Sequence, residues 1–89
     1  MVMWKIKYHR QVKKELPLLK AAHLDSNAKA IIEKLKENPF YYPPPVDKLR
    51  GDMLGMYSRR INQQHRIVYT VENEEETVKI LSMWSHYHE

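Results

Sequence analysis

The period of the apolar positions changes near residue 9, from two residues to between three and four. Residues 4–8 alternate between apolar side chains and lysine, which predicts a strand with one covered face. From His9 onward the apolar residues recur at helical spacing: Val12, Leu16, Leu19 and Ala22. Pro17 lies inside this pattern, and we expect it to kink the helix or to split it in two. The chain therefore begins with a strand that leads into a helix.

A second helical pattern follows a short turn. Asp25 and Ser26 offer side-chain oxygens that can cap the first turn of a helix. The apolar stripe that follows has helical spacing: Ala28, Ile31, Ile32 and Leu35. Asn38 and Pro39 then end the pattern. We expect two antiparallel helices whose charged faces are exposed to solvent.

The segment Phe40–Pro45 contains three consecutive prolines, which force an extended backbone and remove hydrogen-bond donors. Tyr41 and Tyr42 precede the prolines and offer rings on which bases can stack. The favoured interpretation is a rigid connection held by aromatic packing.

A hairpin is predicted next. The segments Tyr57–Ile61 and Arg66–Tyr69 are rich in β-branched and aromatic residues, and they flank the polar turn Asn62–His65. Adjacent residues of a strand point to opposite faces, so Arg59 and Arg60 must face different environments. Burying an arginine without a partner is costly, so at least one face must meet water or an anion. The two interpretations are a solvated edge protected from aggregation and a polyanion-binding face.

An acidic turn, Glu72–Glu76, separates the hairpin from a last strand, Val78–Trp84. The nearly continuous apolar run of this strand suggests burial on both faces. The order is strand, helix, helix, strand, strand, strand. It predicts a single α+β domain over residues 1–89, with an antiparallel-rich sheet packed on two helices.

Composition narrows the classes of function. The 15 Lys and Arg residues outnumber the 11 Asp and Glu residues, which favours nucleic acid or an acidic protein as a partner. The absence of cysteine excludes disulfides and cysteine metal sites. We expect a cytoplasmic location and no membrane association, because the N-terminus lacks the apolar run of a signal peptide and no stretch has the length of a membrane span.

The candidate chemistry is metal-free. The sequence lacks a Ser/His/Asp spacing and a glycine-rich phosphate loop. His86 and His88 are spaced to share one side of a strand, but a third metal ligand is missing. RNA cleavage without metal needs a base, an acid and a cation. Asp47 or a histidine can be the base and His86 or His88 the acid. The cation can come from three arginines: Arg59, Arg60 and Arg66.

The stretch from Leu49 to Tyr69 contains the pattern Y-S-R-R-I-x-x-x-H-R-x-V-Y, and the pair His86-Tyr87 lies near the end of the chain. Together they resemble the Txe/YoeB family, toxins of type II toxin–antitoxin systems within the RelE superfamily. The resemblance implies a microbial-RNase-like fold and a cofactor-free endoribonuclease that cleaves mRNA in the ribosomal A site. It also implies a YefM- or Axe-like antitoxin whose acidic C-terminal segment folds over the basic hairpin, and it is compatible with a homodimer.

The resemblance implies a role for each site residue. Asp47 matches the base, Arg66 the phosphate stabiliser and His86 the acid, while Tyr87 helps to position the substrate. The remaining arginines would contact phosphates: Arg50, and Arg59 or Arg60.

This chain departs from the family pattern at three places. Asp47 is one methylene shorter than the usual Glu, and Gln63-Gln64 replaces a usual Glu-Glu pair. Two residues follow Tyr87, so an alternative alignment gives the acid role to His88. Two alternative functions also stay open: a non-catalytic ParE-like inhibitor of a DNA topoisomerase, and a degenerate toxin that only binds its antitoxin.

Overall fold

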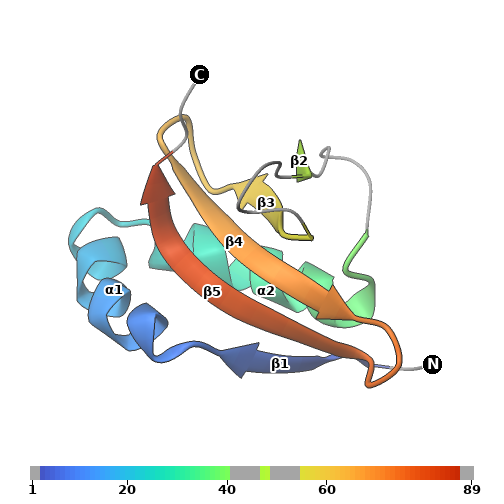
Figure 1. Ribbon diagram of the computed structural model, residues 1–89. Helices are drawn as coiled ribbons and strands as arrows, with labels where there is room; N and C mark the ends of the chain where they lie inside the picture. Colours follow the sequence, from blue (N-terminus) through green and yellow to red (C-terminus); the bar gives the residue numbers. More distant parts are fainter. Residues whose placement is uncertain (1–2, 41–46, 49–54, 87–89) are drawn as a thin grey trace.

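The computed structural model describes residues 3–40, 47–48 and 55–86 (Figure 1). Residues 47–48 and 85–86 are described by their backbone. The elements in chain order are β1 (Lys5–Tyr8), α1 (Arg10–Ala21), α2 (Asp25–Glu37), β2 (Asp47–Lys48), β3 (Tyr57–Arg60), β4 (His65–Glu72) and β5 (Thr77–His86). The predicted α+β class and element order are confirmed, and the short strand β2 is an addition that the sequence pattern did not indicate.

The strands form one sheet in the order β1-β5-β4-β3-β2. β1 pairs parallel with β5, and the other neighbours pair antiparallel. The two helices lie on one face of this sheet, and in Figure 1 α2 passes behind β4 and β5 while α1 lies to the left of β5. We call this side the helix face and the opposite side the outer face. The predicted hairpin is confirmed, because Arg60 pairs with Arg66 and the Ile61 amide donates to the His65 carbonyl at 2.9 Å.

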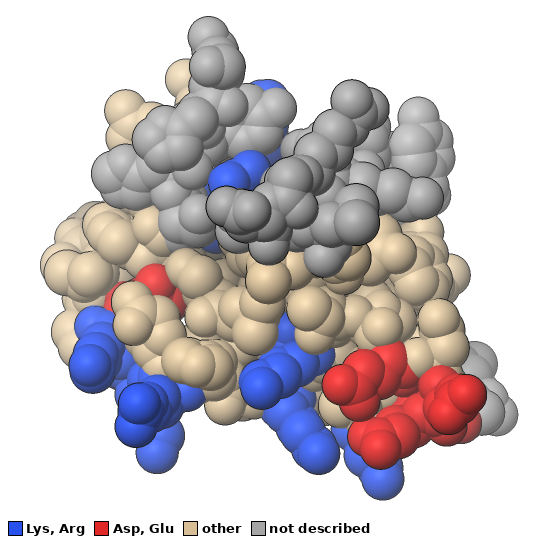
Figure 2. Space-filling model, in the orientation of Figure 1, with Lys and Arg blue, Asp and Glu red and all other residues tan. Residues whose placement is uncertain are grey.

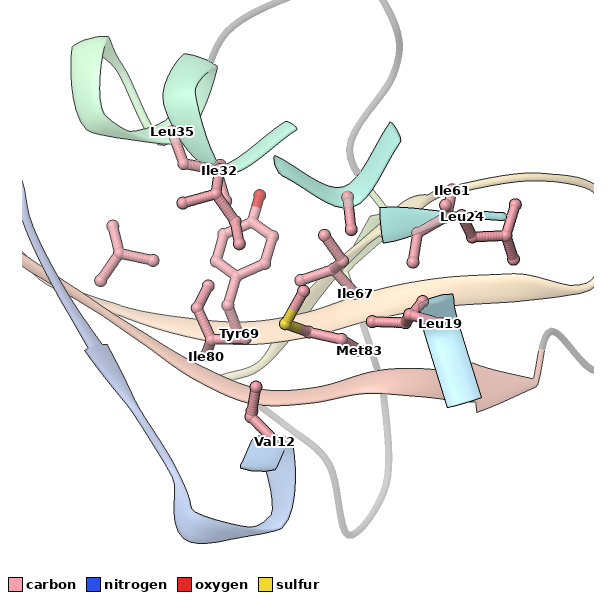
Figure 3. Packing of buried hydrophobic residues seen from close by; sticks show 12 residues of the cluster. Val12, Leu19, Leu24, Ile32, Leu35, Ile61, Ile67, Tyr69, Ile80 and Met83 are labelled. Carbon is pink, nitrogen blue, oxygen red and sulfur yellow. The ribbon is translucent and has the colours of Figure 1, made fainter. Parts of the chain in front are cut away.

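The core fills the space between the sheet and the helices. Its buried residues are Val12, Leu19, Leu24, Ala28, Ile32, Leu35, Ile61, Ile67, Tyr69, Val78, Ile80 and Met83. Tyr69 projects from β4 toward Ile32 and Leu35 of α2, with its hydroxyl at the helix end of the ring (Figure 3). Ile67 and Tyr69, at alternating positions of β4, thus supply the centre of the core, while Val68 and its partner Ser58 are buried on the outer face.

Helix α1 narrows one expectation from the sequence and contradicts another. Pro17 lies within one continuous helix, so of the two expected outcomes, a kink or a split, the split is excluded. Packing of Val12 and Leu19, on either side of Pro17, offsets the lost backbone hydrogen bond. Leu16 was expected in the core but is 40% exposed, whereas Glu15 is only 5% exposed. The buried stripe of α1 therefore includes a carboxyl group.

The start of α2 also differs from the prediction. Leu24 occupies the cap position and makes no side-chain cap hydrogen bond, while Asp25 lies in the first turn. The carboxylate of Asp25 is well placed there to interact with the positive end of the helix dipole. His23, at φ 59°, turns the chain between the two helices. The cap position is therefore occupied by Leu24, an apolar residue that is buried in the core and not a polar residue that could cap the helix. The stripe predicted for α2 and its end at Glu37 are confirmed.

The expectation that β5 is buried on both faces is wrong. β5 lies between β1 and β4, but the helices cover only its helix face and Lys79 is exposed on the other. The apolar run arises because an irregularity in the pairing of β4 with β5 interrupts the alternation near Leu81.

Candidate active site

The two adjacent arginines of β3 face different environments. Arg59 is 1% exposed and lies on the helix face, where it pairs across the sheet with Ile67. Its Nε donates to the Tyr69 hydroxyl at 3.1 Å and its guanidinium donates to the Pro39 carbonyl at 3.3 Å. The Tyr69 hydroxyl itself donates to the same carbonyl at 3.2 Å. Arg59 thus joins the sheet to the end of α2, and this placement favours Arg60 as the arginine that contacts a phosphate.

Arg60 and Arg66 form a cross-strand pair on the outer face. Arg60 is exposed and Arg66 is half-buried, and the two are directly opposite in the pairing of β3 with β4. Like charges opposite each other destabilise a sheet. A guanidinium group presents a fork of donors that matches phosphate oxygens, so this pair is a candidate site for a polyanion. Of the two interpretations of the hairpin, this arrangement is compatible with the polyanion-binding face.

The sheet brings two other candidate residues toward this pair. The backbone of Asp47 in β2 pairs with Ser58, two residues before Arg60. On the other side, Ser85 pairs with Arg66, and His86 pairs with His65. Segments nearly forty residues apart in the chain thus flank the arginine pair, one on each side of the β3–β4 hairpin. Arg50, Tyr87 and His88 lie outside the described residues.

The sequence pattern places His65 in the polar turn of the hairpin, and this placement is wrong. It is the first residue of β4, is buried, and stacks on Trp84 of β5 with ring centroids 4.0 Å apart. Asn62 instead organises the turn, because its side-chain oxygen accepts from the amides of Gln64 and His65 at 2.9 and 2.7 Å. The stacked pair supports the backbone next to Arg66. The sequence feature that could have indicated this stacking is Trp84, an aromatic residue two positions before His86 in the last strand.

Charge is divided along β4 and β5. Acidic side chains gather at the lower right of Figure 2, over the β4–β5 turn, where Glu72, Glu74, Glu75 and Glu76 are exposed. Lysine and arginine side chains follow the lower left and lower edge of the same view. Arg66 is the second residue of β4 and Glu72 the last, so about 20 Å separates the two positions along the strand. The acidic cluster is too distant to neutralise the arginine pair, given a Debye length of about 8 Å in physiological salt.

Two further observations concern ligands and membranes. Within the part of the chain that the structure describes, no three His, Cys, Asp or Glu residues gather in a group that could hold a metal ion. Among the described helices, none combines the length and the apolar character needed to cross a bilayer.

Comparison with known proteins identifies the family. Residues 3–87 match the model of the YoeB-like toxin of bacterial type II toxin–antitoxin systems. The chain is 33% identical over 57 residues to the toxin YoeB of Synechocystis, and this alignment spans 64% of each protein. The YoeB/ParE toxin from Agrobacterium tumefaciens has a similar fold, with a TM-score of 0.80 and 26% identity over 93% of this chain and 99% of that one.

A second solved structure is the heterotetrameric complex of YoeB and YefM from Staphylococcus aureus. It contains a chain with a TM-score of 0.68 and 28% identity, covering 94% of this chain and 98% of that one. The family match extends over nearly the whole sequence and includes both the hairpin of Arg60 and Arg66 and the strand that ends at His86. The chain therefore belongs to the family of YoeB-like toxins of bacterial type II toxin–antitoxin systems.

Proposed function

We propose that this toxin is a ribosome-dependent endoribonuclease that cleaves mRNA in the A site and so inhibits translation. The observation that carries the proposal is the cross-strand pair of Arg60 and Arg66, at the end of the sheet where β2 contributes Asp47 and β5 contributes His86. One carboxyl group, one imidazole and a cation are the groups that cleavage of RNA without a metal requires.

Arg66 has the central role in this mechanism. When the 2′-hydroxyl of the nucleotide attacks the adjacent phosphorus, a pentacoordinate phosphorane with added negative charge forms. Arg66 is half-buried and its backbone is held in β4, so its guanidinium would need little reorganisation to stabilise this charge. Arg60, which is exposed, and Arg50 would bind flanking phosphates and hold the RNA across the outer face.

Proton transfer would involve the strands on either side. Asp47 accepts the proton of the 2′-hydroxyl, His86 donates a proton to the departing 5′-oxygen, and Tyr87 positions the RNA. The products are a 2′,3′-cyclic phosphate and a free 5′-hydroxyl. β2 and β5 are separated by three strand spacings, about 14 Å between backbones. An RNA backbone that crosses the ends of β3 and β4 would therefore lie between the segments that carry Asp47 and His86.

The proposal is tested by mapping mRNA 5′ ends and measuring single-turnover cleavage of ribosome-bound mRNA. Arg66→Ala should lower the cleavage rate by about two orders of magnitude, the usual effect of removing one preorganised donor. Arg66→Lys should recover part of the rate, because a point charge cannot make the forked contact. Lys79→Ala is the matched control, since it removes an exposed cation from the opposite end of the sheet. Cleavage by Arg66→Ala at the wild-type rate would refute the mechanism.

The same assay distinguishes the alternatives. His86→Ala should be nearly as damaging as Arg66→Ala and His88→Ala much milder, and the reverse result would transfer the acid role to His88. A small effect of Asp47→Asn would mean that another group supplies the base. An intact toxin that produces no new mRNA ends but inhibits supercoiling by a DNA topoisomerase would support the ParE-like alternative.

We also propose that an antitoxin with an acidic C-terminal segment binds the basic hairpin. The family is defined by toxin–antitoxin systems, and the S. aureus neighbour forms a complex with YefM. Binding to Arg60 and Arg66 predicts an affinity that falls as salt concentration rises, and a weaker complex for Arg60→Glu. Salt-independent binding would instead indicate an apolar contact. The YoeB dimer from S. aureus, which has a TM-score of 0.71 to this chain, makes a homodimer a second assembly to test by sedimentation.

A further inference from the structure

Glu15 in α1 has a buried carboxyl group that the proposed mechanism does not use. It is 5% exposed and accepts three hydrogen bonds. The Met83 amide donates to Oε1 at 2.7 Å, the Ser82 hydroxyl donates to Oε2 at 2.8 Å, and the Gln11 side chain donates more weakly at 3.5 Å. Burying a carboxyl group in a small core is costly unless its hydrogen bonds are satisfied. The two short bonds both lead to the same point of β5.

This point is where the pairing of β4 with β5 changes register. Tyr69 pairs with Ile80, but Val68 pairs with Ser82 and Arg66 with Ser85, so β5 gains one residue at each of two steps. Continuation of the first register would place Met83 opposite Arg66 and Trp84 opposite His65. The two insertions bring Ser85 and His86 to these positions instead. An even number of inserted residues also preserves which positions face the helices.

A register shift of this kind leaves backbone groups outside the ladder, and a buried N–H must find another acceptor. The Glu15 carboxyl group is that acceptor for Met83. Ser82 extends the arrangement, because its hydroxyl also accepts from the Trp84 amide at 3.4 Å. One side chain of α1 is thus bonded to β5 at the irregular segment, three residues before His86.

We propose that Glu15 is a positioning residue of the toxin, whose carboxyl group holds the register shift that brings Ser85 and His86 opposite Arg66 and His65. The inference rests on the proposed function in so far as His86 is the acid. The register itself does not depend on that role. In this role Glu15 contacts neither the substrate nor the reacting atoms, and it acts through the backbone of β5.

The test compares three variants of the full chain. Glu15→Ala removes both short hydrogen bonds, while Glu15→Gln retains an oxygen for the Met83 amide and an amide group that can bond the Ser82 hydroxyl. Glu37→Ala, on the exposed last turn of α2, is the control with the same change in charge. Cleavage of ribosome-bound mRNA gives kcat and KM, and NMR gives the cross-strand contacts of Arg66 with Ser85 and the hydrogen exchange of the Met83 amide.

We expect Glu15→Ala to lower kcat by about tenfold, with KM changed by less than about twofold, because a small misplacement of a catalytic group affects the chemical step. Glu15→Gln should retain kcat within about threefold, and Glu37→Ala should equal the wild type. In Glu15→Ala the contact between Arg66 and Ser85 should be lost and the Met83 amide should exchange about tenfold faster. A stabilising role alone would leave kcat of the folded fraction unchanged, and that result would overturn the proposal.

The remaining outcomes are also decisive. If Glu15→Ala does not fold, Ser82→Ala removes one of the two short bonds. It should lower kcat by about threefold and accelerate Met83 exchange, and an unchanged rate and exchange would overturn the proposal. If the wild-type toxin does not cleave RNA, the proposed function fails, whereas the NMR measurement still tests whether Glu15 holds the register. A native Arg66–Ser85 contact in Glu15→Ala would refute that role.

Discussion

Arg59 and Arg60 are neighbours in β3 with the same charge, yet they occupy opposite faces of the sheet. On the helix face, Arg59 is enclosed and bonded to the Tyr69 hydroxyl and the Pro39 carbonyl. On the outer face, Arg60 is exposed and lies opposite Arg66. On the helix face, two of the hydrogen bonds of Arg59 go to neutral oxygens of the protein itself. The outer face places two arginines on neighbouring strands, and this is the face that we propose binds the anionic RNA.

The largest expected effect is at Arg59. Arg59→Ala should lower the free energy of unfolding by about 4 kcal/mol, because it leaves a cavity and removes hydrogen bonds from two buried oxygens. Urea unfolding followed by circular dichroism measures this change. Arg59→Met fills much of the volume without restoring the donors, so it should lower stability by about half as much. If Arg59→Ala changed the free energy of unfolding by less than about 1 kcal/mol, Arg59 would not be the enclosed and hydrogen-bonded residue described above.

A core leucine should have the next largest effect. Leu19→Ala should destabilise the toxin by about 3 kcal/mol, since Leu19 is fully buried between α1 and the sheet. Leu16 of the same helix is the control, and its substitution by alanine should cost less than about 1 kcal/mol because it is 40% exposed. If Leu19→Ala and Leu16→Ala lowered the free energy of unfolding equally, a different set of α1 residues would face the core.

A smaller effect is expected when one hydroxyl is removed from the Arg59 site. Tyr69→Phe retains the ring that packs on α2 and removes the group that bonds both Arg59 and Pro39. The free energy of unfolding should fall by about 1.5 kcal/mol, the usual range for losing a buried hydrogen bond to a charged group. A double-mutant cycle of Tyr69→Phe with Arg59→Met measures their coupling. Strict additivity would contradict the hydrogen bond between them.

The smallest expected effect on stability is at Arg60. Arg60→Ala should change the free energy of unfolding by less than about 0.5 kcal/mol, because the side chain is exposed. Its effect should be on RNA, with the salt dependence of single-stranded RNA binding reduced by about 0.7 in slope for one lost phosphate contact. Lys79→Ala is again the control. A loss of stability comparable to that of Arg59→Ala would remove the distinction between the two faces.

Much of this contrast follows from local pattern. Alternation in β3 requires Arg59 and Arg60 to face opposite sides, and the hairpin with its polar turn follows from residues that are near neighbours in the chain. The motif from Tyr57 to Tyr69 also identified the family correctly. The same reasoning failed at Leu16 and His65. Their environments are set by the sheet that packs on α1 and by Trp84, and neither contact can be read from nearby residues.

The order of the elements, the fold class, the hairpin and the family follow from local sequence pattern, because periodicity and turn residues act over a few positions. Which arginine is enclosed depends on the folded structure, since it requires knowing which face the helices cover. The register of β5 also depends on the folded structure, through the hydrogen bonds of Glu15 with Ser82 and Met83, which lie 67 and 68 positions later in the chain. Such contacts form only when the chain has folded, so the local pattern around Glu15 does not reveal them.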